Sequence, residues 1–176
     1  MTNILLIAIG VIAGVILTAL GMIYAMRRWM VVAHPSRRSF EDTCAAIERV
    51  ISANKGWGFP IPSWNFYETF VKKNLVPKGI LELRIFFVCK SALASRVIAD
   101  TPPMAGIMPC SWAVYEREDG SVWLSKMNIA LMAMMFSGVI REAMSEVARM
   151  DRVFLEEVLG HREQSPSGEP QNELMG

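Results

Sequence analysis

Residues Ile4 to Met26 form a run of 23 residues without a charged side chain, and Arg27 and Arg28 follow it directly. As an α-helix rising about 1.5 Å per residue, this run is roughly 34 Å long, and the hydrocarbon core of a bilayer is about 30 Å thick. A helix buried in a soluble domain rarely runs this far without a charge, and a chain of 176 residues is too small to enclose it. We therefore expect residues 1–30 to form a single transmembrane helix with its interface.

A cleaved signal peptide is the main alternative for this run. Such a peptide has a basic segment before a shorter apolar core and a small-residue cleavage site after it. Residues 1–3 (Met-Thr-Asn) carry no charged side chain, and the basic pair lies on the far side of the run. We therefore expect a permanent anchor surrounded by membrane lipid.

The charges around the span predict its orientation. Before the first acid, Glu41, the segment after the span carries four arginines: Arg27, Arg28, Arg37 and Arg38. Basic residues beside a span are retained on the cytoplasmic side. We expect a single-pass protein of the cytoplasmic (inner) membrane with its N-terminus outside and its C-terminal domain in the cytoplasm. Arg27, Arg28 and Trp29 are the residues expected at the membrane interface.

Small residues in the span predict contact with another helix. Gly10 and Gly14 are four positions apart, and Gly21 lies two turns further on. This spacing lets two helices approach closely in a membrane. Chance is the alternative, because glycine is common in membrane spans. We expect these three glycines to pack against another membrane-protein subunit or a second copy of the chain.

Charge is unevenly distributed along the chain. The overall balance is +1, and four of the 18 basic residues lie in 27–38, where there is no acid. The rest therefore carries 14 basic and 17 acidic residues. A nucleic-acid-binding domain needs basic residues spread over its folded body. We expect no nucleic-acid partner.

Cysteine and histidine are scarce. The cysteines are Cys44, Cys89 and Cys110, without a C-x-x-C pair, which is typical of a reducing compartment rather than a disulfide framework. The histidines, His34 and His161, fall in a predicted linker and tail, so a four-ligand zinc site is not expected. Phosphate-binding loops, Ser/His/Asp arrangements and haem motifs are also absent from the sequence. We predict no metal, no cofactor and no catalytic residues.

The remaining chain divides into three parts. Residues 31–38 read as a basic linker that Pro35 keeps from continuing the helix. Residues 39–159 are predicted to form one α+β domain with a mostly antiparallel sheet packed against helices. Residues 160–176 are polar and rich in Pro, Gly and Ser, and we expect them to be disordered.

Periodicity predicts the elements of the domain. Helices are expected after Ser39, at 66–75, at 91–100 and over 129–159 with a break near Ser137-Gly138. Strands are expected at 81–89, 104–116 and 121–127, and a hairpin turn at 118–120 joins the last two. The apolar helical stripe that includes Cys44 predicts a buried, structural thiol there. Arg84 lies in an apolar strand, where it is either solvent-facing or paired with Glu82 or Glu116.

Two segments resemble a known family. Residues 86–94 (Phe-Phe-Val-Cys-Lys-Ser-Ala-Leu-Ala) resemble the strand–Cys–helix segment of domain-of-unknown-function family 302, and residues 106–116 (Gly-Ile-Met-Pro-Cys-Ser-Trp-Ala-Val-Tyr-Glu) resemble its second signature. Residues 122–128 are similar to its strand ending in Met-Asn. The resemblance implies a compact α+β domain, often dimeric, with no established reaction. Lys90-Ser91 stands here in place of the usual Asn-Pro, and Met108 in place of Leu.

Cys89 and Cys110 are the sharpest candidates for chemistry. Both lie at signature positions of the family, on strands that are predicted neighbours. Two thiols serve redox exchange, sulfur transfer or soft-metal binding. Cysteine is also among the most buried residue types, and core packing is the alternative.

Methionines cluster near the last helix, where they either pack in the core or form a partner-facing patch. They are Met127, Met132, Met134, Met135 and Met144.

Three functions follow from this sequence. The first is a non-catalytic accessory subunit, anchored by its span and docked on a larger membrane assembly, such as an electron-transfer complex, or on itself. The second is a thiol-based redox or sulfur-handling protein that uses Cys89 and Cys110. The third is a small-ligand or cofactor-binding module with a cleft between sheet and helices.

Overall fold

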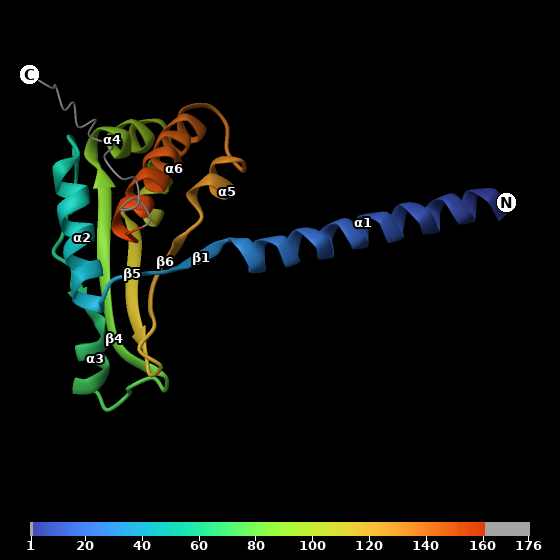
Figure 1. Ribbon diagram of the computed structural model, residues 1–176. Helices are drawn as coiled ribbons and strands as arrows, with labels where there is room; N and C mark the ends of the chain where they lie inside the picture. The colour runs from blue at the N-terminus through green and yellow to red at the C-terminus, as the bar shows by residue number, and fades with distance from the viewer. Residues whose placement is uncertain (1, 161–176) are drawn as a thin grey trace, which may run out of the picture.

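A long apolar helix, α1 (Thr2–Trp29), projects from a folded α+β domain (Figure 1). The structure is a computed structural model that describes residues 2–160, so the predicted disordered tail lies almost wholly outside the described residues. Within that range one helix is long and apolar enough to cross a membrane: Ile9–Trp29 has a mean hydropathy of 2.2 and buries none of this stretch inside the protein.

The domain confirms the predicted α+β class. Its strands are β1 (Val31–Pro35), β2 (Trp57–Gly58), β3 (Trp64–Asn65), β4 (Ile80–Lys90), β5 (Cys110–Arg117) and β6 (Val122–Met127). Its helices are α2 (Phe40–Ala53), α3 (Phe66–Lys72), α4 (Ser91–Asp100), α5 (Ile129–Ala133) and α6 (Gly138–Val158), with a 3-10 helix, η1 (Pro102–Ile107). The sheet order is β1-β6-β5-β4-β2, with β3 also paired to β4, and every pairing is antiparallel.

The segment predicted as a linker enters the sheet. Val31 to Pro35 form the edge strand β1, with Val31 opposite Met127 and Pro35 opposite Trp123. β-Branched Val31 and Val32 favour a strand, and Pro35 is tolerated because an edge strand has one unpaired side. The linker interpretation of 31–38 was therefore wrong for its first five residues, and one residue, Met30, separates α1 from the sheet.

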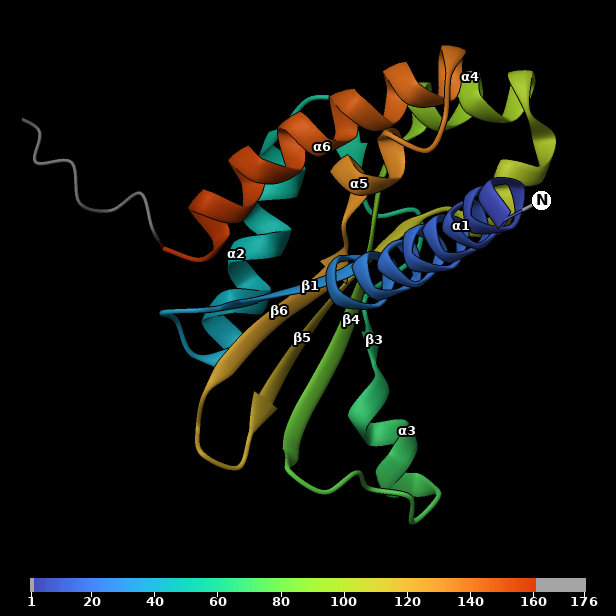
Figure 2. The same ribbon diagram turned by 90° about the vertical axis from the view of Figure 1, so that its right-hand side faces the viewer.

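Helices α2 and α6 cover one face of the sheet (Figures 1 and 2). The Ser39 hydroxyl accepts a hydrogen bond from the Asp42 N–H at 3.1 Å and begins α2, as its sequence predicts. The apolar stripe of α2 packs with inward residues of β4, β5 and β6 and with Phe154 of α6. Cys44 is buried in this core.

The connection between β4 and β5 differs from the prediction in its second half. Helix α4 spans the predicted residues, but the strand expected to start at Met104 starts at Cys110. Pro102 and Pro103 open η1 instead. The fixed φ angle of proline suits the first turn of a helix, and proline lacks the N–H that a strand would donate to its neighbour. The hairpin turn after β5 is as predicted, with Gly120 at φ +75°.

The last helical stretch is broken where the sequence indicates. Helix α5 ends at Ala133, and α6 begins at Gly138, whose φ of +57° suits glycine. The break folds α5 back against α6. A second apolar cluster joins these two helices to α4 and η1 beyond one end of the sheet.

Candidate functional site

The candidate site lies at the end of the sheet where β4 ends, β5 begins and β6 ends. The register places Val88 opposite Cys110 and Trp112 opposite Lys126, so the three strands share this edge. Helices α4, α5 and α6 and η1 close over it (Figure 1). The result is a pocket between sheet and helices, the place expected for a ligand cleft.

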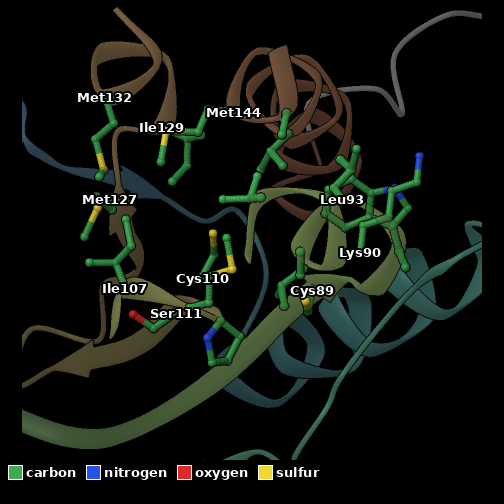
Figure 3. A pocket seen from close by; sticks show the side chains of 18 residues that line it. Cys89, Lys90, Leu93, Ile107, Cys110, Ser111, Met127, Ile129, Met132 and Met144 are labelled. Carbon is green, nitrogen blue, oxygen red and sulfur yellow. The ribbon is translucent and has the colours of Figure 1, made fainter. Parts of the chain in front are cut away.

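The pocket is almost wholly apolar (Figure 3). Its walls include Leu93 and Val97 of α4, Ile107 of η1, and Ala143 of α6. The cavity measures about 100 Å³. An apolar cavity of about 150 Å³ stays dry and binds benzene. This pocket has about two thirds of that volume, so a single ring or a short hydrocarbon chain is the largest group that it accepts without widening.

Sulfur atoms are unusually frequent on the walls. Cys89 and Cys110 both line the pocket from neighbouring strands, so the structure brings the two candidate thiols to one site. They join four methionines: Met108, Met127, Met132 and Met144. All three cysteines of the chain are free thiols. Methionine adapts its shape to a ligand at low cost, which suits a binding pocket.

Burial weakens the acidity of every thiol. It raises the pKa of Cys110 to about 11 and that of Cys44 to about 12, and it also raises the pKa of Cys89. Asp151 adds to the effect at Cys110, and Lys126 opposes it. The thiolate is the nucleophile in thiol exchange and sulfur transfer. These environments therefore favour a protonated pocket lining over thiol chemistry.

Alkylation kinetics test this reading of the thiols. At pH 7.5 we expect iodoacetamide to modify Cys89 first, Cys110 more slowly and Cys44 only after unfolding, because a rise of two pKa units lowers the thiolate fraction about 100-fold. Peptide mass spectrometry at timed intervals gives the three rates, with urea-unfolded protein as the control. Modification of native Cys110 at the rate of unfolded Cys110 would support the thiol-based alternative instead.

Two ion pairs lie around the pocket, and sequence reasoning missed both. Lys90, on the pocket wall, binds Glu146 of α6 at 2.6 Å. Lys126 of β6 binds Asp151 of α6, with side chains only 5% and 11% exposed. Burial raises the pKa of Asp151, an effect that Lys126 opposes. Alternation in β6 puts Lys126 on the face of Val122 and Leu124, but no sequence signal identifies a partner 25 residues away.

The other predicted residues are placed as follows. Gly10, Gly14 and Gly21 are exposed along α1, and a methyl group added at any of them meets nothing within 4 Å. Trp29 is exposed at the end of α1. Arg84 was predicted to be either solvent-facing or paired with Glu82 or Glu116. It is paired, but with Glu41, through two hydrogen bonds of 3.1 Å.

The methionines near the last helix divide between the two predicted roles. Met144 is buried in the second cluster, and Met132 packs against it. Met134 and Met135 are exposed, at 76% and 62%. Met127 lines the pocket and is partly exposed at its rim. Core packing and an exposed apolar patch therefore coexist in one segment.

Metal-binding residues do not converge in the described structure. Within residues 2–160 no group of three or more His, Cys, Asp or Glu side chains is placed to hold a metal ion. His34 lies in β1, and His161 falls outside the described residues. The chemistry of the site is thus that of an apolar pocket flanked by ion pairs.

Comparison with known proteins identifies the family. A search of curated proteins gave no match. The crystal structure of an uncharacterized conserved DUF302 protein from Bacillus stearothermophilus is similar with a TM-score of 0.62 and 18% identity, covering 73% of this chain and 98% of that one, which shows a shared fold. The family model described as Domain of unknown function DUF302 matches residues 32–159, nearly the whole folded domain. The chain therefore belongs to the DUF302 family.

Proposed function

We propose that this protein is a membrane-anchored, non-catalytic module that binds a small apolar molecule. The observation that carries the proposal is the pocket between the sheet and α4, α5 and α6, whose walls are apolar apart from Lys90, Ser111 and the two thiols. Lys90 is already paired with Glu146. The ligand is thus expected to be uncharged, and either a single ring or the end of a longer hydrocarbon chain.

What supports the anchor is the exposed, apolar length of α1 and the arginines beside it. An 18-residue stretch of such hydropathy is unfavourable in water and matches the thickness of a bilayer. Arg27 and Arg28 favour a cytoplasmic domain and an external N-terminus. A ligand that dissolves in membranes would then be concentrated beside its pocket.

Catalysis and thiol exchange have less support. Cys89 and Cys110 are held protonated by burial, and Lys90, the basic group on the pocket wall, is neutralised by Glu146. A general acid–base catalyst needs a group whose pKa lies near the working pH. Binding without reaction is the simpler use of such a pocket.

Filling the pocket tests the ligand proposal. Ala143 is buried on the pocket wall, and Ala143→Leu adds three carbons to a cavity of about 100 Å³. Ala45→Leu makes the same change on the exposed face of α2 and serves as the control. From full-length protein in detergent-free native membrane discs, we expect solvent extraction and mass spectrometry to recover one enriched apolar compound. The yield should be at least tenfold lower with Ala143→Leu and unchanged with Ala45→Leu.

Equal recovery from all three proteins would count against the pocket as the binding site. Thermal unfolding of each variant separates a filled pocket from a misfolded domain. Overpacking typically costs about 1–3 kcal/mol, so Ala143→Leu is expected to remain folded. A variant that still unfolds in one cooperative transition, at a midpoint lowered by no more than this cost, and that lacks the compound supports the proposal.

An accessory subunit of a larger membrane complex, with electron transfer as one setting, is the second candidate. The feature that favours it is the glycine face of α1, where a methyl group added at Gly10 or Gly14 meets nothing within 4 Å. Close approach of a second helix at these positions requires no side chain to move. The two functions are compatible, because a ligand-binding domain and an interacting span belong to different parts of the molecule.

A further inference from the structure

The end of β6 and the helix that follows it are held at the point where α1 leaves the domain. The Asn128 N–H donates to the Met30 carbonyl at 2.9 Å, and the Asn128 side-chain amide donates to the Trp29 carbonyl at 3.1 Å. Helix α5 starts at the next residue. Figure 2 looks at the domain from the side on which α1 projects, and α5 and α6 lie on that side. If α1 spans a bilayer, α5 lies next to its surface.

Several exposed apolar residues lie at this exit point or follow it shortly in the chain. Met134 and Met135, just after α5, are 76% and 62% exposed. Trp29, Met30, Val31 and Met127 are also exposed, at the end of α1 and at the adjoining end of the β1–β6 pair. Contiguous exposed apolar residues at a surface mark contact with a partner or a membrane.

Charges on α6 are separated into two rows. On the row facing α4, Glu142 binds Arg96 at 3.3 Å and Glu146 binds Lys90 at 2.6 Å. The other row faces α5 and consists of three arginines: Arg141, Arg149 and Arg152. Within residues 2–160, none of these three arginines forms a salt bridge, although Arg149 adds to the effect by which Lys90 lowers the pKa of Glu146.

A groove joins the arginine row to Met134, the exposed methionine that follows α5. It lies between α5 and α6, measures about 390 Å³, and is lined by these three arginines together with Met134 and Ala133. Unpaired guanidinium groups bind phosphate oxygens well, often through two hydrogen bonds. Exposed apolar side chains next to basic ones are also the combination found in helices that lie in a membrane interface.

We propose that the α5–α6 surface docks on an anionic bilayer, with Met134 and Met135 among the headgroups and Arg141, Arg149 and Arg152 on lipid phosphates. The inference rests on the membrane anchor proposed above. It is independent of whether the pocket is occupied. It also gives the pocket a route to the membrane, because Met132 and Met127, on either side of Asn128, line the pocket, and Met127 is partly exposed.

Hydrogen exchange on the full chain tests this docking. The protein is reconstituted in nanodiscs of phosphatidylcholine alone and of phosphatidylcholine with 30% phosphatidylglycerol, and exchange is followed by mass spectrometry. We expect amides in residues 129–153 to exchange at least fivefold more slowly in the anionic discs. The variant R141Q/R149Q/R152Q should lose this difference. The variant K55Q/K73Q/K78Q removes the same charge at exposed positions outside the groove and should keep it.

Each result has a definite meaning. A protein that does not enter nanodiscs at all rejects the anchor. A protein that enters them but exchanges equally in both lipids rejects the docking surface while the anchor stands. Equal loss of protection in both triple variants would reduce the effect to net charge and also reject the proposed site. Protection seen only in native membranes, and not with pure anionic lipid, would assign the surface to a protein partner instead.

Discussion

Replacing Lys126 with Met is expected to destabilise the domain by about 3–5 kcal/mol, because it leaves the buried carboxylate of Asp151 without its partner. Both side chains are almost wholly enclosed, at 5% and 11% exposure. Methionine keeps most of the apolar stem of the lysine and removes its Nζ, which lies 5.9 Å from the centre of the Trp112 ring. Since domains of this size are stable by about 5–15 kcal/mol, the loss is a large part of the total.

The pH dependence of this variant identifies the cause. Burial raises the pKa of Asp151, and Lys126 opposes that rise, so removing Lys126 raises the pKa further. An acid whose pKa is raised in the folded state costs nothing below its unfolded pKa, where both states are protonated. Its cost grows as pH rises from the unfolded pKa toward the folded pKa, and it levels off above the folded pKa. We therefore expect Lys126→Met to be mild near pH 4 and severe at pH 8.

A double variant supplies the matched control. Lys126→Met with Asp151→Leu removes both charges, and replacing a buried ion pair by apolar residues is often neutral or stabilising. Urea unfolding of each protein in mild detergent, followed by tryptophan fluorescence, gives the free energies. A double variant as unstable as Lys126→Met would show that lost packing, rather than the unpaired carboxylate, causes the effect.

Local chain features were predictable because they depend on nearby residues. Ser39 as helix cap, Gly120 in the hairpin and the break at Gly138 follow from short-range geometry. The position of Cys44 follows from helical periodicity. The apolar run before Arg27 is the strongest case, since its length alone matches α1.

The site was only partly predictable, because it depends on contacts between distant segments. Signature positions indicated Cys89 and Cys110, and strand pairing does bring them to one pocket. Nothing in the sequence pairs Lys126 with Asp151 or Arg84 with Glu41, since both contacts arise from the packing of helices on the sheet. The split of the methionines between pocket and surface likewise depends on how α5 folds back on α6.

Residues 31–35 were predicted as part of a linker but form strand β1, for a physical reason. An edge strand has one partner, so its sequence needs little alternation and tolerates Pro35. The same strand connects the span to the sheet with only Met30 between them. If α1 spans a bilayer, this short connection limits which face of the domain can meet the membrane.

Deleting residues 2–28 is expected to move the protein from the membrane fraction to the soluble fraction without unfolding the domain. The apolar stretch of Ile9–Trp29 is not buried inside the protein, so its removal exposes no core. The DUF302 crystal structure is covered over 98% of its length by 73% of this chain. The deletion keeps Trp29 and Met30, whose carbonyls accept the hydrogen bonds from Asn128. We expect a thermal midpoint close to that of the full chain, measured by circular dichroism after carbonate extraction of membranes.

Span replacement then separates the two uses of α1. Exchanging residues 4–26 for an unrelated apolar span without a small-xxx-small pattern restores anchoring but removes the Gly10–Gly14 face. If α1 is only an anchor, the replaced chain keeps its ligand and its oligomeric state. If α1 binds another helix, the replaced chain keeps its ligand and loses the subunits that co-purify with the native chain. Persistence of the full-length chain in the soluble fraction would contradict both, since each requires α1 to lie in a bilayer.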